Sequence, residues 1–159
     1  MNLESSQPPR RVIELGIASV GGIGYVPQGP ATVGTAVGAS AFLFFRPRLS
    51  LRIMLAAAAT IAGQACAVRL HNDRDPDPQY VIIDEVAGVW LALAALPATN
   101  RSWLAGSIVF RVLDKFKPGP IGVMDRHGGT WSLMGDDLLA GLLAAILVRL
   151  GARLGASAG

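Results

Sequence analysis

Apolar residues along this chain gather in blocks that are separated by short polar or proline-containing breaks. Five blocks carry no charged residue, and they span residues 33–45, 53–68, 86–100, 102–110 and 138–148. Alanine and leucine dominate these blocks, which favours helix, whereas the alternation of β-branched and polar residues typical of strands is scarce. The pattern therefore predicts an all-α fold, a compact bundle of about five or six helices, with no internal repeat.

One short run departs from this pattern. Val81-Ile82-Ile83 is β-like in composition, but it leads directly into Asp84-Glu85 and a long apolar block. Proline is tolerated in the first turn of a helix, so we interpret Pro78 as the start of a helix that contains both acids.

The composition points to a bundle that is associated with a membrane. Hydrophobic residues make up 52% of the chain and charged residues 16%, with a mean hydropathy of +0.45. A soluble protein usually carries roughly 25% charged residues, so this chain has too few to cover a surface that faces only water. A spanning helix needs about 20 apolar residues, and block 53–68 comes nearest when Leu51 and a snorkelling Arg52 extend it. Two arrangements stay open: several short, tilted spans, or a compact bundle resting in one leaflet.

The net charge of +3 comes mainly from arginines at the edges of the apolar blocks. These are Arg10, Arg11, Arg46, Arg48, Arg52, Arg149 and Arg153. Their placement suits anionic lipid head groups and the cytoplasmic side of a membrane, so the expected partners are a membrane and an anionic phospholipid. No basic stripe with interleaved aromatic residues is present, which argues against a nucleic-acid partner. The oligomeric state stays open.

The length of the chain fits one domain. We expect residues 1–11 to form a disordered tail, residues 12–151 a single helical domain and residues 152–159 a flexible tail. The first eleven residues are polar, and no cleavable signal peptide is evident. Cys66 is the only cysteine and lies in an apolar run, so we interpret it as a core thiol.

The acidic residues are distributed unevenly. None of the eleven lies between Glu14 and Asp73, and none follows Asp137. Six lie in or beside apolar blocks: Asp84, Glu85, Asp114, Asp125, Asp136 and Asp137. Burying a carboxylate is costly unless it is paired or bound to a metal, and few cations lie near enough to pair all six. The distribution therefore predicts a site for a divalent ion.

The spacing of these acids supports their convergence. Asp84 and Glu85 are expected near the start of one helix, with Gly88 a turn later leaving room for another backbone. Asp136 and Asp137 are expected to open the last helix, where the helix dipole favours carboxylates, and Gly141 again leaves room.

The segment around Asp114 adds cations to the acids. Arg111 and Asp114 are three residues apart, so they share one face of a helix. Lys117 precedes Pro118-Gly119-Pro120, which must end that helix. Taken alone, Arg111 and Asp114 would be interpreted as an ion pair within one helix. Asp136 and Asp137 taken alone would be interpreted as a helix cap. The three acidic segments together favour a metal site.

The ligand types indicate which metal and which chemistry to expect. Carboxylates without a cysteine or histidine set favour Mg²⁺, or Mn²⁺, over zinc. Such ions activate water and neutralise charge on phosphate during hydrolysis. Arg111, Lys115 and Lys117 lie close by in sequence and could hold phosphate oxygens. His127 precedes Gly128-Gly129, a pair typical of a mobile loop, and is a weaker candidate for a role in the site.

Three segments in this order resemble the phosphatidylglycerophosphatase A family. The first runs from Asp77-Pro78 through Ile82-Ile83-Asp84-Glu85-Val86-Ala87-Gly88. The second is Phe110-Arg111-Val112-Leu113-Asp114-Lys115-Phe116-Lys117-Pro118-Gly119-Pro120-Ile121, and the third is Asp136-Asp137-Leu138-Leu139-Ala140-Gly141. The resemblance covers about residues 18–148. It implies an all-α fold and Mg²⁺-dependent hydrolysis of phosphatidylglycerophosphate to phosphatidylglycerol and phosphate at the bacterial inner membrane. A site that faces the cytoplasm is the default expectation from the lone cysteine, which cannot form an internal disulfide.

Two segments depart from the family's pattern. A Pro-Gly-Thr of the family appears here as Pro30-Ala31-Thr32, and alanine enters positive φ less easily than glycine, so we expect a loop of different shape. Thr32 is retained and could hydrogen-bond phosphate. The stretch 129–136 looks one residue longer than usual, and Gly135 stands where a bulky apolar residue is common.

These observations lead to one hypothesis for the site. The predicted catalytic and metal-binding residues are Asp84, Glu85, Asp114, Asp136 and Asp137, which would hold one or two Mg²⁺ ions, with Asp77 and Asp125 as weaker metal candidates. The predicted substrate-binding residues are Thr32, Arg111, Lys117 and His127. One carboxylate would act as general base toward water.

Two alternatives stay open. The substrate could be another lipid or a soluble phosphomonoester. The acids could instead form ion pairs or an ion pathway in a non-enzymatic membrane transport or scaffold protein, which would release no phosphate and need no metal.

Overall fold

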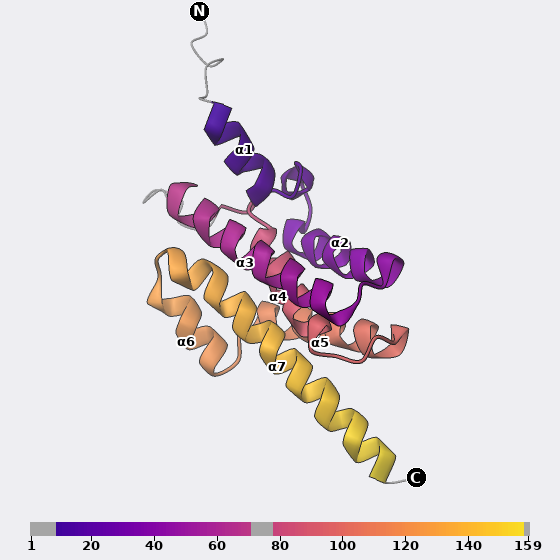
Figure 1. Ribbon diagram of the computed structural model, residues 1–159. Helices are drawn as coiled ribbons and strands as arrows, with labels where there is room; N and C mark the ends of the chain where they lie inside the picture. Colours follow the sequence, from indigo (N-terminus) through magenta and orange to yellow (C-terminus); the bar gives the residue numbers. More distant parts are fainter. Residues whose placement is uncertain (1–8, 71–77, 158–159) are drawn as a thin grey trace, which may run out of the picture.

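The computed structural model describes residues 9–70 and 78–157, and all regular secondary structure in these two ranges is helical (Figure 1). The elements are α1 (Pro9–Ala18), the 3₁₀ turn η1 (Ile23–Tyr25), α2 (Pro30–Phe45), α3 (Leu49–Leu70), α4 (Ile83–Ala94), α5 (Asn100–Phe116), α6 (Pro120–His127) and α7 (Thr130–Ser157). The all-α prediction is confirmed. The described ranges hold seven α-helices rather than five or six, because α1 and α6 are short and carry charges that the apolar pattern does not count.

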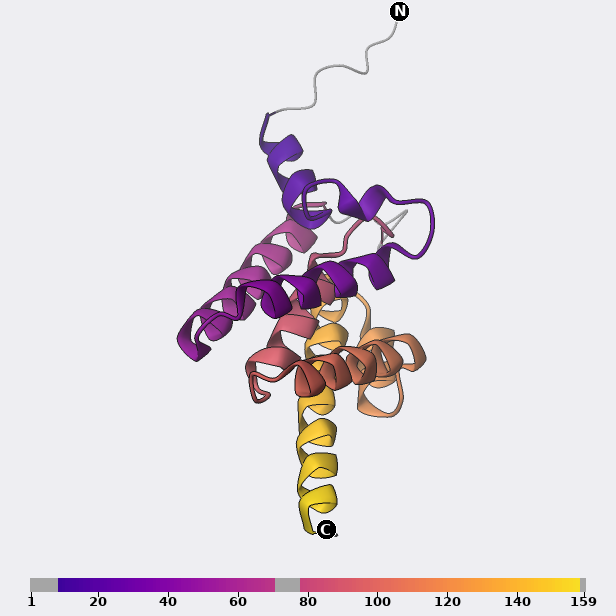
Figure 2. The same ribbon diagram turned by 90° about the vertical axis from the view of Figure 1, so that its right-hand side faces the viewer.

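Helix α4 forms the centre of the bundle. It packs against α2, α3, α5 and α7, which surround it in both views (Figures 1 and 2). Ten of its twelve residues are buried, including Val89 and Leu93. These pack with Phe42 of α2 and with Trp103 and Phe110 of α5 in the main apolar core. Burial of large aliphatic and aromatic side chains around one helix is the main stabilising term of this arrangement.

The start of α4 differs from the prediction. The chain does not enter a helix at Pro78: the Val81 N–H donates to the Pro78 carbonyl at 2.9 Å, which closes a turn. The Ile82 N–H donates to the carbonyl of Ala18, the last residue of α1, also at 2.9 Å. This long-range bond holds the chain outside the helix until Ile83, so Asp84 and Glu85 lie in the first turn of α4, as expected.

The start of α7 also differs from the prediction. Asp136 and Asp137 do not open this helix, because it begins at Thr130 and places them in its second turn. Gly128 and Gly129 have φ angles of 68° and 80°, a conformation open to glycine, and reverse the chain directly after α6. Since the helix dipole acts mainly in the first turn, it does not explain the position of these two acids.

The outer helices extend past the limits expected for the domain. Helix α1 begins at Pro9, before residue 12, and α7 continues to Ser157, beyond residue 151. Residues 1–8 of the expected N-terminal tail lie outside the described residues. The last turns of α7 project from the bundle in both views (Figures 1 and 2).

Arg52 has a structural role that the sequence pattern did not predict. Its side chain is buried rather than snorkelling, and its Nη1 donates to the carbonyls of Leu93 and Leu96 at 3.2 and 3.0 Å. Its guanidinium lies 5.6 Å from the centre of the Trp103 ring. Carbonyls near the end of a helix are incompletely paired, and here Arg52 donates to one in the last turn of α4, Leu93, and to one just beyond the helix, Leu96. Arg52 is therefore not one of the arginines available to lipid head groups.

Replacing Arg52 with methionine should destabilise the protein by about 2–4 kcal/mol, because two buried carbonyls would lose a charged donor. Thermal unfolding in detergent, followed by circular dichroism, measures this effect. The matched control is Arg48→Met, since Arg48 is exposed and its replacement should leave the melting temperature nearly unchanged. Equal melting temperatures for the two variants would contradict the capping role of Arg52.

Two of the described helices are long and apolar enough to cross a membrane. They are α3 with 22 residues and the range Thr130–Ala156 of α7 with 27, so both exceed the length of the apolar blocks they contain. In the most apolar 18 residues of each helix, 33% of the stretch in α3 and 22% of the stretch in α7 is buried inside the bundle. The length and composition of these two helices are consistent with membrane association.

Candidate active site

A pocket of about 490 Å³ lies where the start of α4, the end of α5 and the first turns of α7 meet. The start of α2 and the turn between α6 and α7 complete its walls. Its polar lining contains all five predicted catalytic carboxylates together with Asp125 and Lys117: Asp84, Glu85, Asp114, Lys117, Asp125, Asp136 and Asp137. The predicted convergence of the three acidic segments on one cavity is thus present in the structure.

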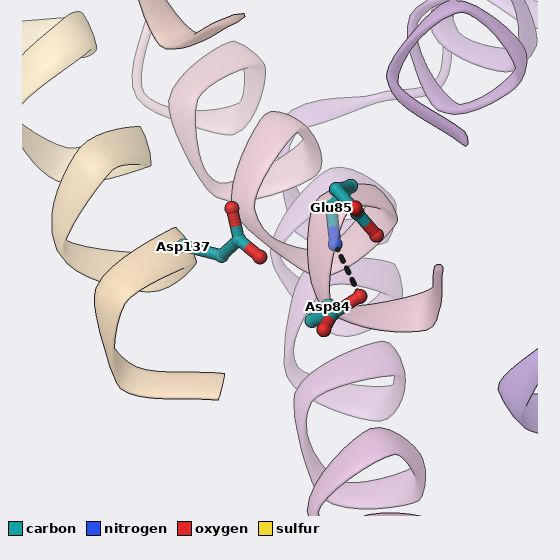
Figure 3. Close-up of side chains that lie close together, drawn as sticks. All are labelled: Asp84, Glu85 and Asp137. Carbon is teal, nitrogen blue, oxygen red and sulfur yellow. Dashed lines mark hydrogen bonds between the residues drawn. The ribbon is translucent and has the colours of Figure 1, made fainter. Parts of the chain in front are cut away.

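Three of the carboxylates form a tight group. Asp84, Glu85 and Asp137 each offer an oxygen within 4.8 Å of the other two, and all three side chains are buried. Asp84 and Glu85 come from the first turn of α4, and Asp137 faces them from α7 (Figure 3). The Glu85 N–H donates to Asp84 Oδ1 at 3.0 Å, which helps to fix the Asp84 carboxylate.

Two oxygens of this group lack partners among the described residues. They are Glu85 Oε2 and Asp137 Oδ1, and both are buried. A buried carboxylate oxygen without a hydrogen bond is costly, and such groups are rare in folded proteins unless an ion or water satisfies them. Three converging carboxylates are also the donors that Mg²⁺ or Mn²⁺ prefers. The residues present therefore fit a hard divalent cation.

Without such a cation, Glu85 keeps its proton up to near neutral pH. Burial raises the pKa of Glu85 from 4.5 to about 7, and repulsion from Asp137 and Asp114 adds to the effect of burial. The folded state therefore holds this proton more tightly than the unfolded state. Between about pH 4.5 and pH 7, rising pH therefore lowers the free energy of unfolding of the metal-free protein.

Replacing Glu85 with glutamine should therefore stabilise the metal-free protein at pH 8, by up to about 3 kcal/mol, because a buried charge is removed. Melting temperatures at pH 5 and pH 8 in the presence of a chelator measure the change. The gain should shrink toward pH 5, where Glu85 itself is protonated. A variant that is less stable than the parent at pH 8 would show that Glu85 holds the fold together rather than serving the site.

The two other predicted carboxylates are paired with cations. Asp114 forms an ion pair with Arg111 on the same face of α5, as the three-residue spacing predicted. Asp136 accepts a hydrogen bond from Lys117 Nζ at 2.6 Å, and Lys117 also contacts Asp125 of α6. Burial lowers the pKa of Lys117, but its hydrogen bonds and its attraction to both carboxylates outweigh burial and raise it, so Lys117 stays charged. The five predicted acids thus divide into a close trio and two acids that position cations.

Glycines bring the two acidic helices together. A Cβ atom added to Gly141 of α7 would lie 2.2 Å from the carbonyl oxygen of Gly88 in α4. One added to Gly88 would lie 2.7 Å from the carbonyl oxygen of Asp137. This confirms the close approach predicted at both positions, and it places Asp137 opposite Asp84 and Glu85.

The remaining predicted residues are less closely involved in the pocket. Thr32 is exposed, but its Oγ1 accepts a hydrogen bond from Arg111 Nε at 3.3 Å, which links α2 to the cation beside Asp114. His127 ends α6 and is exposed; its Nδ1 lies 2.7 Å from the Val123 carbonyl oxygen, and it does not line the pocket. Asp77 lies outside the described residues.

Ala31 and Gly135, two of the differences from the family's pattern, each have a local explanation. Ala31 lies in the first turn of α2, and the positive φ angle, 61°, belongs to Gly29 instead, so Ala31 needs no unusual backbone. A Cβ atom on Gly135 would lie 2.8 Å from Met124 Cε, so α6 fills the space that a bulky side chain would take.

Some lining residues were not predicted from the sequence. Ser132 is buried at the pocket wall, and its single O–H is shared between the carbonyls of Met124 and Asp125, whose oxygens lie 2.8 and 2.9 Å from Oγ. This contact ties α7 to the end of α6. Gly29 and Pro30 form part of the wall at the start of α2. The available signal was the Gly-Pro pair, since proline is common at the first position of a helix.

Comparison with known proteins agrees with this geometry. The family described as phosphatidylglycerophosphatase A matches residues 16–152 of the chain. A protein of Bacteroides thetaiotaomicron, named as a candidate phosphatidylinositol-3-phosphatase, is 33% identical over 136 residues, which is 80% of this chain and 86% of that protein. A phosphatidylglycerophosphatase A of Haemophilus influenzae is 30% identical over 132 residues, 80% of this chain and 81% of that protein. The protein of that name from Escherichia coli is 43% identical over 72 residues, 43% of this chain and 41% of that protein. No solved structure matches the chain.

Proposed function

Because this chain belongs to the phosphatidylglycerophosphatase A family, we propose that it hydrolyses phosphatidylglycerophosphate to phosphatidylglycerol and phosphate with the help of Mg²⁺. The chain is an enzyme, a phosphatase, and family membership sets aside the non-enzymatic alternative. The reaction would be a step in phosphatidylglycerol biosynthesis.

The observation that carries the metal proposal is the trio on α4 and α7. Asp84, Glu85 and Asp137 are buried, their oxygens lie within 4.8 Å of one another, and two of those oxygens lack partners among the described residues. These three residues would hold Mg²⁺, or Mn²⁺. When bound, the ion would activate water and neutralise charge on the phosphate.

The paired acids and cations would position the phosphate. Asp114 holds Arg111, and Asp136 holds Lys117, so both cations are fixed before substrate arrives. Preorganised cations stabilise the charge that develops on a phosphoryl group without reorganising during the reaction. Thr32 accepts a hydrogen bond from Arg111 and would help to hold that cation toward the phosphate. A pocket carboxylate would accept the proton of the attacking water.

Location follows from the same proposal. We place the enzyme at the bacterial inner membrane, with its pocket toward the cytoplasm. Supporting observations are the two helices long and apolar enough to span, and the arginines at the edges of the apolar blocks, which are exposed except for Arg52. Apolar surroundings for the diacyl chains and a polar pocket for the head group are what a lipid phosphatase needs.

A second substrate has one specific observation in its favour. The match to the Bacteroides thetaiotaomicron relative covers 80% of this chain, and that protein is named as a candidate phosphatidylinositol-3-phosphatase. Both lipids present a phosphate monoester on a head group that already carries a phosphodiester. The pocket's charges recognise the monoester in either case, so the choice between them depends on the rest of the head group.

A panel of phosphate-release assays tests the proposal. Purified enzyme is given phosphatidylglycerophosphate, phosphatidic acid, phosphatidylinositol 3-phosphate or soluble glycerol phosphate, each with Mg²⁺ or with a chelator. We expect the highest kcat/KM for phosphatidylglycerophosphate and no release with the chelator. A higher kcat/KM for another substrate would make that compound the substrate. Equal rates with Mg²⁺ and with the chelator would contradict the proposed metal dependence.

A further inference from the structure

The outward face of α5 carries an apolar stripe. Four large side chains recur at every fourth position and are exposed: Leu104 by 58%, Ile108 by 56%, Val112 by 49% and Phe116 by 72%. Residues four apart are neighbours on one side of a helix, so these four form a continuous surface. Single exposed apolar residues are common on proteins, but a row of four along one helix calls for a partner.

The apolar core does not account for this stripe. The inner face of α5 is already apolar, with Trp103, Gly106 and Phe110 buried against the bundle. A helix that is apolar on both faces belongs either in the centre of a protein or against lipid. Because the stripe is exposed on an outer helix, the second setting fits it.

The charges on α5 favour an anionic lipid. Its exposed charged residues are Arg101 near one end of the stripe and Lys115 near the other, and both are cations. Its one acid, Asp114, is buried and paired with Arg111. A surface with an apolar middle and cationic ends matches acyl chains beside anionic head groups.

The stripe also leads to the pocket. Phe116 at its end is the direct neighbour of Lys117, which lines the pocket and holds Asp136. The stripe measures about 18 Å from Leu104 to Phe116, so it is long enough to contact an acyl chain, which occupies roughly 15 Å of one leaflet. A lipid lying along α5 would therefore bring its head group to the end of α5 where the acids and cations lie.

We propose that this α5 stripe is the lipid-contacting surface that delivers the substrate, with acyl chains against Leu104, Ile108, Val112 and Phe116 and the head group at the pocket. The identity of the delivered lipid rests on the proposed function. The contact with anionic phospholipid does not, and it can be measured without catalysis.

A kinetic experiment tests delivery. The double variant Ile108→Ser with Val112→Ser is compared with a matched variant carrying leucine at both positions. On long-chain phosphatidylglycerophosphate in anionic vesicles, the serine variant should lose roughly ten-fold or more in kcat/KM, mainly through KM, because two apolar contacts are lost. On the short-chain, water-soluble form of the same substrate it should stay within about two-fold of the parent, and the leucine variant should match the parent on both. Equal loss on both substrates would overturn the proposal, and so would no loss on either.

A contact measurement separates this proposal from the proposed function. A fluorophore is attached to the thiol of the variant Val112→Cys, since the native Cys66 is buried, and the protein is placed in anionic vesicles whose acyl chains carry a quencher. We expect strong quenching at this position whether or not the enzyme accepts phosphatidylglycerophosphate. Absence of quenching would overturn the proposal. If energy transfer between labelled copies appeared in its place and vanished on dilution, the stripe would belong to a contact with a second copy of the chain.

Discussion

Replacing Asp84 with asparagine should lower Mg²⁺-dependent phosphate release by roughly a thousand-fold, because a metal-binding carboxylate loses its charge while its shape is kept. Asp84 stands in the buried trio with Glu85 and Asp137, and its Oδ1 also accepts the Glu85 N–H. Asparagine can still accept that hydrogen bond through its side-chain oxygen. The change therefore acts on the charge of the site more than on its geometry. Single-turnover and steady-state phosphate release at saturating Mg²⁺ measure it.

The matched control for Asp84→Asn is another exchange of acid for amide. Glu14 of α1 pairs with Arg69 of α3 and does not line the pocket, so Glu14→Gln should keep nearly the parental rate. Both variants should retain the parental circular dichroism spectrum. If Asp84→Asn released phosphate at close to the parental rate with the same Mg²⁺ dependence, the assignment of the trio as the metal site would be wrong.

The acids of the pocket could be predicted because this chain has so few charges to place. In an apolar sequence, a carboxylate inside a helix is costly to bury unless it has a partner or a function. Asp84, Glu85 and Asp137 face one another in the structure. Their neighbouring glycines were informative for the same reason: Gly88 and Gly141 interrupt good helical sequence, and the structure uses both for a close helix crossing.

The different roles of the acids could not be predicted from local patterns. Asp136 and Asp137 are adjacent in sequence, yet one holds Lys117 and the other joins the trio, because successive residues of a helix point in directions about 100° apart. Which neighbour meets the cation depends on how α5 and α7 cross. That crossing is a property of the whole bundle.

Arg52 shows the same limit in the core. Its carbonyl partners, Leu93 and Leu96, are 41 and 44 residues further along the chain. In sequence it looked like the other arginines at the edge of an apolar block, and only the packing of α4 against α3 gives it a buried role. The start of α4 was mispredicted for a similar reason, since the bond from Ile82 to Ala18 joins distant segments.

Replacing Gly141 with alanine should destabilise the protein by more than about 4 kcal/mol, a loss at the extreme of single substitutions, and should remove activity with it. The added Cβ would lie 2.2 Å from the Gly88 carbonyl oxygen, so backbone would meet backbone. Helix α4 cannot retreat, because ten of its twelve residues are buried against its neighbours. Thermal unfolding in detergent and phosphate release on the same preparation measure both losses.

The matched control for Gly141→Ala lies on the same helix. A Cβ atom on Gly151 would meet nothing within 4 Å, so Gly151→Ala should be neutral or stabilise the protein by up to about 1 kcal/mol through the higher helix propensity of alanine. Opposite signs for the same substitution at two positions of one helix would identify the crossing, not glycine itself, as the cause. A melting temperature for Gly141→Ala within a few degrees of the parent would instead mean that α4 and α7 are farther apart than the trio requires. Asp137 would then lie too far from Asp84 and Glu85 to share an ion with them, so this stability measurement also tests the metal site.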